Sequence, residues 1–148
     1  MPELRAGTVI TGTDVPTMVS AIVTGLESPT STSFIAGSAT CGVAFVAPTT
    51  GRVLIEWRAN LDNSTNAFTI VAPEVRTGSS VGSGTVVLAA SDVNALYGFG
   101  TNELGFGCFV PLDGLTPGES YNVRLMHRVT SGTGTIQNSR EVIVLPLT

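Results

Sequence analysis

The sequence predicts an all-β protein folded as an antiparallel β-sandwich, with an N-terminal arm in front of one compact domain. Its 148 residues include 20 Thr, 18 Val, 17 Gly and 13 Ser, a composition that suits short strands joined by turns. Apolar and polar residues alternate along several segments, which is typical of half-buried strands. Turn sequences such as Asp113-Gly114 and Pro117-Gly118 separate these segments. A chain of this length can bury a sufficient core without disulfides or a metal.

The alternation is clearest from Arg52 to Leu61, where every odd position is apolar and Trp57 is therefore expected to point inward. Residues 43–46 form a second apolar run, and the turn sequence 48–51 between the two runs favours a hairpin. Two more strands are expected over residues 66–77 and 85–90. Pro73 should mark a bulge or a sheet edge in the first of these.

The second half repeats the pattern over residues 104–112 and 121–129. The final strand, 141–147, is apolar on both parities, so we expect a central strand that is covered on both sides, by the second sheet and by a partner chain or a loop. The inward positions of these strands should share one core between two sheets. They are Val53, Ile55, Trp57, Phe106, Cys108, Tyr121, Val123 and Leu125.

Residues 1–32 differ from the rest of the chain. Their apolar residues fit helical spacing after Asp14 and Pro16, yet the segment is also rich in Val and Thr, so helix and strand both remain open. A polar break at 27–33 suggests a division into an arm, 1–32, and a sandwich domain, 33–148. The arm carries apolar side chains for attachment to another surface, among them Leu4, Val9, Ile10, Val15, Val19 and Ile22.

The charged residues exclude several functions. The net charge is −4, and all seven basic residues are Arg. No basic cluster can neutralise a run of phosphates, so nucleic-acid binding is not expected. The first residues lack the pattern of a secretory signal and no apolar run is long enough to span a membrane, which predicts synthesis in the cytoplasm and no membrane partner.

Residues for catalysis are scarce. His127 is the single imidazole and has inward parity, and no nucleophile elbow, metal-ligand spacing or phosphate loop occurs. We therefore expect no enzymatic activity, no metal and no cofactor. Cys41 and Cys108 are expected to be buried free thiols. Tyr97 and Phe99 are the aromatic residues that could face solvent and stack on a sugar ring.

Three stretches of the sequence resemble a module of structural proteins from tailed phages of actinobacteria: residues 45–54, residues 82–91, and residues 115–129 together with 139–146. The resemblance covers about residues 34–148. It implies a jelly-roll-like sandwich, similar in outline to trimers of the tumour-necrosis-factor type, and display on a virion. Residues 115–121 also resemble the tyrosine corner of fibronectin type III and immunoglobulin-like domains, which is the competing fold.

The sequence thus predicts a structural protein of a virion surface, made in the host cytoplasm. Capsid decoration through the N-terminal arm is the first hypothesis, with the major capsid protein or another virion protein as partner. A tail or fibre component that binds a host-surface glycan is the alternative. The low content of charged residues, 12%, favours a homotrimer, with His127, Val142 and Val144 near the subunit contact.

Overall fold

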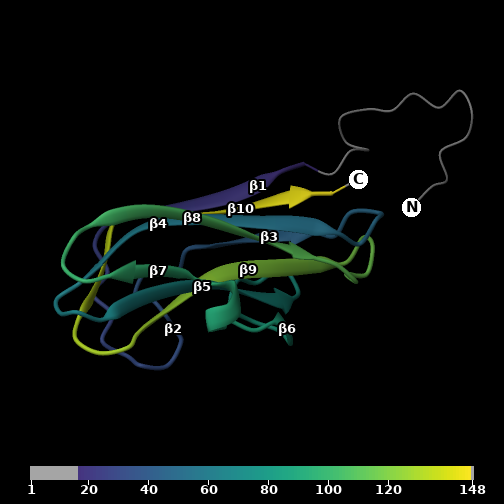
Figure 1. Ribbon diagram of the computed structural model, residues 1–148. Helices are drawn as coiled ribbons and strands as arrows, with labels where there is room; N and C mark the ends of the chain where they lie inside the picture. Colours follow the sequence, from purple (N-terminus) through teal and green to yellow (C-terminus); the bar gives the residue numbers. More distant parts are fainter. Residues whose placement is uncertain (1–16, 148) are drawn as a thin grey trace, which may run out of the picture.

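The computed structural model describes residues 17–147, which form two antiparallel sheets packed face to face (Figure 1). In spatial order, sheet A contains β1 (Val19–Thr24), β10 (Gly134–Pro146), β4 (Val53–Asn63) and β8 (Leu104–Leu112). Sheet B is built on β9 (Ser120–Val129) and β5 (Phe68–Thr77). β2 (Ile35–Ala36) and β3 (Gly42–Val46) pair with β9, whereas β6 (Val86–Leu88) and β7 (Leu96–Phe99) pair with β5. The one-turn 3-10 helix η1 (Asp92–Asn94) precedes β7.

The order of the strands identifies the sandwich as a jelly roll. Without the short strands β2 and β6, each sheet is a row of four strands: β1-β10-β4-β8 in sheet A and β3-β9-β5-β7 in sheet B. Most connections of the chain lead from one sheet to the other. This two-sheet arrangement of eight strands is the jelly-roll architecture. The expected hairpin between residues 43–46 and 52–61 is wrong, because β3 pairs with β9 in sheet B while β4 lies in sheet A. The turn at 48–51 is a crossing between sheets.

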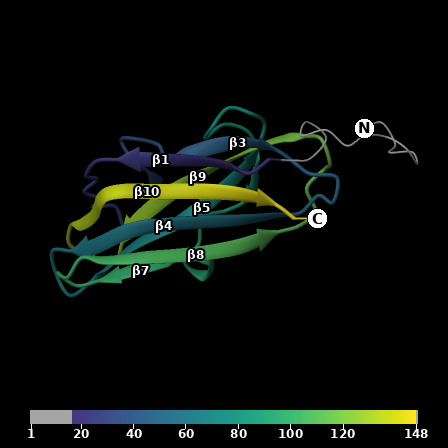
Figure 2. The same ribbon diagram turned by 90° about the horizontal axis from the view of Figure 1, so that it is seen from above.

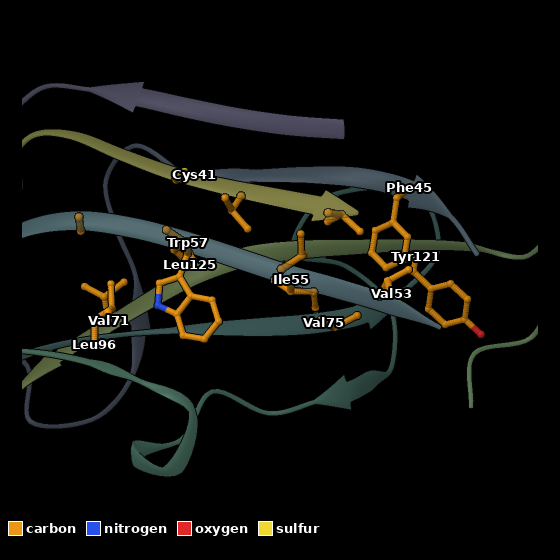
Figure 3. Close-up of a cluster of buried hydrophobic side chains, with 14 of the residues drawn as sticks. Cys41, Phe45, Val53, Ile55, Trp57, Val71, Val75, Leu96, Tyr121 and Leu125 are labelled. Atoms are coloured by element: carbon orange, nitrogen blue, oxygen red, sulfur yellow. The ribbon is translucent and has the colours of Figure 1, made fainter. Parts of the chain in front are cut away.

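The core forms as the alternation predicted. In β4 the inward residues Val53, Ile55 and Trp57 are at most 2% exposed. From β9, Tyr121, Val123 and Leu125 meet them, and Phe106 and Cys108 of β8 are partly buried against the same cluster. Figure 3 shows Trp57 among the buried side chains that lie between the two sheets.

The division at residue 32 is wrong. Val19, Ala21 and Val23 of β1 pack on the core, and β1 pairs along its whole length with β10 (Figure 2). Glu27 continues the contact through two backbone hydrogen bonds with Ile136, of 2.9 and 3.1 Å. The sandwich therefore includes the described chain from Val19 onward, and period-2 burial settles this segment as strand. Leu4, Val9, Ile10 and Val15 lie outside the described residues.

Pro73 lies inside sheet B, where it pairs with Leu125 of β9. On the other side of β5, pairing with β7 ends at Val71 and pairing with β6 begins at Val75. Proline lacks the N–H that a ladder requires, and it occupies the gap between these two neighbouring strands. At Pro73, β5 therefore has a neighbouring strand on one side only, and this is the sheet edge that the sequence predicted.

The tyrosine corner is present within the jelly roll. The hydroxyl of Tyr121 accepts a hydrogen bond of 3.0 Å from the backbone N–H of Thr116. Gly51 lies against the same loop at a φ of +66°, and a Cβ on this residue would overlap the carbonyl oxygen of Leu115. The corner therefore connects the loop after β8 to the crossing between β3 and β4.

No helix between residues 17 and 147 is long and apolar enough to span a membrane.

Candidate functional site

His127 lies inside the sandwich beside an ion pair. It is 3% exposed and faces Glu27 and Arg140, with Gly37 packed against both His127 and Glu27. Arg140 donates to Glu27 at 3.2 Å and to the carbonyl of Ala39 at 2.6 Å. These contacts connect the segment after β1, the loop before β3 and strand β10. The imidazole is therefore part of a buried cluster of charged and polar side chains.

The charges in this cluster determine its protonation. Burial lowers the pKa of His127 below its ordinary value, and the positive charge of Arg140 lowers it further against the opposing effect of Glu27. Burial by itself would raise the pKa of Glu27, but hydrogen bonds from Ser38 and the charge of Arg140 outweigh burial, and the net pKa is lowered. At neutral pH the cluster holds an ionised carboxylate, a guanidinium and a neutral imidazole.

Both cysteines are free thiols. Cys41 is buried, and its Sγ donates to the carbonyls of Ala21 and Arg140. Burial raises the pKa of the Cys41 thiol. Cys108 is half-buried on β8.

The outer face of sheet A has no described element over it (Figure 2). Its side chains are apolar around Leu54 and polar toward the other end of β4, at Arg58 and Asn60. Cross-strand register places Leu145 of β10 beside Leu54 of β4, and Leu54 beside Pro111 of β8. In the next row Ile143 and Phe109 flank Glu56. Phe109 is 64% exposed, which is high for an aromatic side chain. We call this surface the open face; its outward apolar residues are Ile22, Leu54, Phe109, Pro111, Ile143 and Leu145.

A hollow of about 290 Å³ lies in the open face where Gly107 provides no side chain. Phe109 and Ile143 form its apolar wall, and a second hollow adjoins it over Gly105. Arg58 lines both hollows, and its ion-pair partner Glu141, with N···O of 2.7 Å, lines the first. The next charged residue along β4, Glu56, lines the first hollow.

The expected subunit-contact residues need correction. Val142 and Val144 are at most 1% exposed because they point into the core of their own chain, and His127 is equally inaccessible. The final strand is central, between β1 and β4, and the chain covers only its inner side. Its outward residues are Ile143 and Leu145, which no described element covers. Apolar residues at both odd and even positions indicated in the sequence that this strand is central. The alternation alone did not say which of its two faces the chain itself would cover.

A second group of exposed side chains lies on the outer face of sheet B. Phe68 of β5 and Phe99 of β7 are register partners, with ring centroids 4.9 Å apart. Tyr97 packs edge-on against Phe68 at 5.7 Å. The three rings, which we call the aromatic cluster, are between 38% and 52% exposed. The expectation that Tyr97 and Phe99 face solvent is confirmed, and Phe68 is an addition to it.

An ion pair borders the aromatic cluster. Arg128 of β9 donates through two nitrogens to the carboxylate of Asp92 in η1, and its guanidinium lies over the ring of Phe34 at 5.5 Å. The hydrogen bond from Arg128 holds the pKa of Asp92 below its ordinary value. The hydroxyl of Tyr97 donates to the carbonyl of Asp92 at 2.6 Å. Burial raises the pKa of Tyr97, and the charge of Asp92 adds to this effect.

Sequence reasoning missed Phe68 and Arg128 because they join Tyr97 only through the pairing of β5 with β7 and β9. It also missed Asp92, which lies near Tyr97 in the sequence and accepts a hydrogen bond from its hydroxyl. Phe109 could have been found, because it has the opposite parity to Phe106 and Cys108 in β8. Within residues 17–147, no group of three His, Cys, Asp or Glu side chains could hold a metal ion.

No model of a known protein family matches the sequence, and no curated protein matches it. Among solved structures, the chain is similar to a protein of infectious bursal disease virus, Gx strain, at 13% identity and a TM-score of 0.48, over 99% of this chain and 36% of that one. It therefore spans about a third of the length of the viral protein.

Two further solved structures match over most of both chains. Eiger TNF from S. frugiperda matches at 12% identity and a TM-score of 0.46, over 90% of this chain and 94% of that one. A Bacillus endospore appendage protein, from a family of disulfide-linked pili, matches at 13% identity and a TM-score of 0.40, over 97% and 100%. These similarities are of overall fold.

Proposed function

We propose that this chain is a non-enzymatic structural subunit on the surface of a tailed-phage particle, and that it serves there as a capsid decoration protein. The observation that carries the proposal is the open face, a group of apolar side chains on the outer side of sheet A that no described element covers and in which Ile22 and Phe109 are more than half exposed. Large apolar patches on a folded protein mark surfaces that bind other proteins. The resemblance of residues 34–148 to virion proteins of actinobacterial phages supports the setting.

The edge of sheet A favours assembly as well. β8 is an outer strand with nine residues and no charged side chain between Leu104 and Leu112. Natural edge strands of this length are usually protected by charges, proline, bulges or a covering element, and of the residues in β8 only Pro111 is of this kind. Phe109 and the hollow over Gly107 lie next to this edge. A surface with an aromatic knob beside a hollow suits tight contact with another protein.

We expect the first partner to be a second copy of the chain, in a homotrimer, with Phe109, Ile143 and Leu145 at the contact. The second partner is the major capsid protein or another virion protein. For the contact with this second partner we propose residues 1–16 of the expected arm, because β1 itself belongs to the sandwich. A position on the tail or a fibre instead of the capsid is the alternative within the same proposal.

The decisive experiment locates the chain in intact particles. Peptide mass spectrometry of purified particles should detect it, and immunogold electron microscopy should place the label over the head. Label over the tail would favour the alternative. A chain found in infected cells but absent from particles would contradict the proposal.

Variants of the chain connect this location to the open face. Particles stripped of the protein should rebind wild-type chain, whereas Phe109→Arg should rebind poorly because it places a charge on the apolar face. Val93→Arg is the matched control, since Val93 is 90% exposed and belongs to η1, on the side of sheet B. Equal rebinding by Phe109→Arg and Val93→Arg would exclude the open face from assembly.

A further inference from the structure

The aromatic cluster lies on the opposite side of the sandwich from the open face. The chain has only nine aromatic residues, and Phe68, Tyr97 and Phe99 lie together on the outer face of sheet B, with Phe34 on the far side of Arg128. In Figure 1 this face points away from β1 and β10, toward η1 and β6. An assembly that uses the open face therefore leaves the aromatic cluster accessible.

The cluster is rigid before any ligand arrives. Phe68 and Phe99 are held by pairing between β5 and β7, and the hydroxyl of Tyr97 is tied to the backbone of η1. Gly98, between Tyr97 and Phe99, allows β7 to lie against β4, because a Cβ there would overlap Leu61. Preorganised side chains lose little conformational entropy when they bind a ligand.

The surroundings of the cluster carry hydroxyl and amide groups and little free charge. Backbone hydrogen bonds join Thr130 to Phe68 and Gly100 to Ala67, which brings the loops after β4, β7 and β9 to the same end of the sandwich. Exposed side chains of these loops include Ser64, Thr65, Asn66, Thr101, Asn102 and Thr130. The nearest opposite charges, Asp92 and Arg128, neutralise each other in one ion pair.

The geometry points to a binding site for an uncharged carbohydrate at the aromatic cluster. The C–H groups on one face of a pyranose ring pack on aromatic rings, while its hydroxyls need many weak donors and acceptors at the rim. An apolar floor with a few fixed polar groups is the usual composition of a small-molecule site. The exposed oxygens of Asp92, held by Arg128, add acceptors next to Tyr97. A polyanionic ligand would find no unpaired cation among these groups.

The test is titration of the full chain, labelled with ¹⁵N, against unsubstituted gluco-, galacto-, manno- and arabino-oligosaccharides. We expect at least one of them to shift the amide signals of Gly98 and Gly100 at millimolar concentration or below. Phe99→Ala should weaken that affinity about tenfold, since it removes one aromatic surface from the site. Phe109→Ala, an exposed aromatic of the other sheet, should leave it unchanged. Thermal unfolding of both variants verifies that they are folded.

Three results would overturn the inference. The first is the absence of any shift with every neutral oligosaccharide at millimolar concentration. The second is binding that persists unchanged in folded Phe99→Ala, or that prefers polygalacturonate over all neutral sugars. The third is self-association of the chain that Phe99→Ala abolishes and Phe109→Ala does not, which would make a second copy the occupant. The first two results leave rebinding through the open face untouched, so the two proposals can fail independently. The third would also contradict self-assembly through Phe109, and particle rebinding by Phe109→Arg then tests the open face by itself.

Discussion

Tyr121 and Trp57 share one core but differ in what their polar atoms do. The Tyr121 hydroxyl accepts a hydrogen bond from Thr116, whereas the buried indole N–H of Trp57 has no hydrogen-bond partner. A buried donor without a partner costs about 1–3 kcal/mol relative to solvent. The two aromatic residues therefore respond differently to the loss of their polar group.

We expect Tyr121→Phe to lower the free energy of unfolding by about 1 kcal/mol, because one hydrogen bond of the corner is lost. Trp57→Phe should change it by less than about 1.5 kcal/mol, since relief of the unpaired N–H offsets part of the cavity left by the smaller ring. Urea denaturation measures both. Ile55→Ala is the reference for a plain cavity, at about 2–5 kcal/mol. If Trp57→Phe were as damaging as Ile55→Ala, the unpaired indole would be of no energetic consequence.

The His127 cluster predicts loss of stability in mild acid. Burial lowers the pKa of His127, so below its ordinary pKa of 6.5 the unfolded chain binds a proton that the folded chain does not, and acid favours unfolding. The lowered pKa of Glu27 acts in the same direction, but only nearer its ordinary value of 4.5. Unfolding followed between pH 7.5 and 5.5 should show falling stability. His127→Gln should flatten this slope, and a slope that persists in His127→Gln would contradict the assignment.

The two thiols should differ in reactivity with iodoacetamide. Burial raises the pKa of Cys41, which lowers its thiolate fraction, while Cys108 is half-buried on an edge strand. Mass spectrometry after limited labelling should find Cys108 modified first and Cys41 modified only in denaturant. The intact mass should be identical with and without reductant. Faster labelling of Cys41 would mean that the segment around β1 opens readily.

At the scale of elements, β1 shows how burial overrides an ambiguous pattern. Residues 19–24 fit helical spacing in isolation, but next to β10 their alternate side chains Val19, Ala21 and Val23 gain cover from the core. Competition between local and distant contacts also explains why β3 and β4 do not pair with each other. A turn sequence between two apolar runs permits a hairpin, and the better partner for β3 is β9, far away in the sequence.

Truncation separates the arm from β1. Deletion of residues 1–16 should leave the free energy of unfolding nearly unchanged, because every strand from β1 onward is retained. Deletion of 1–26 should lower it by about 2–4 kcal/mol, since the half-buried residues of β1 are lost and β10 becomes an edge. Thermal and urea unfolding measure the difference. If both truncations are equally stable, β1 contributes nothing to the sandwich.

For the whole molecule, the two sheets offer surfaces of different character. The outer side of sheet A is apolar around Phe109, Ile143 and Leu145, and that of sheet B carries the aromatic cluster with its ion pair. Because hydrophobic association grows with the apolar area removed from water, the open face should drive self-assembly. The sheet B surface is then directed outward.

Light scattering of the full chain at micromolar concentration should give the mass of a trimer. Phe109→Arg should shift the distribution toward monomer by at least about tenfold in the dissociation constant, because the open face then carries a charge that assembly must desolvate. Val93→Arg should remain trimeric. A monomeric wild-type chain would refute self-assembly through this face.

Local pattern alone determined the inward residues of β4, β8 and β9, because strand parity has a period of two and one face must be apolar wherever a core is covered. It also predicted the all-β class and the solvent exposure of Tyr97 and Phe99. Only the tertiary structure decided which strands are neighbours, and hence that Phe68 and Arg128 join Tyr97 while Val142 and Val144 turn inward. The physical reason is that pairing in a jelly roll links segments distant in sequence, and local periodicity contains no information about partners.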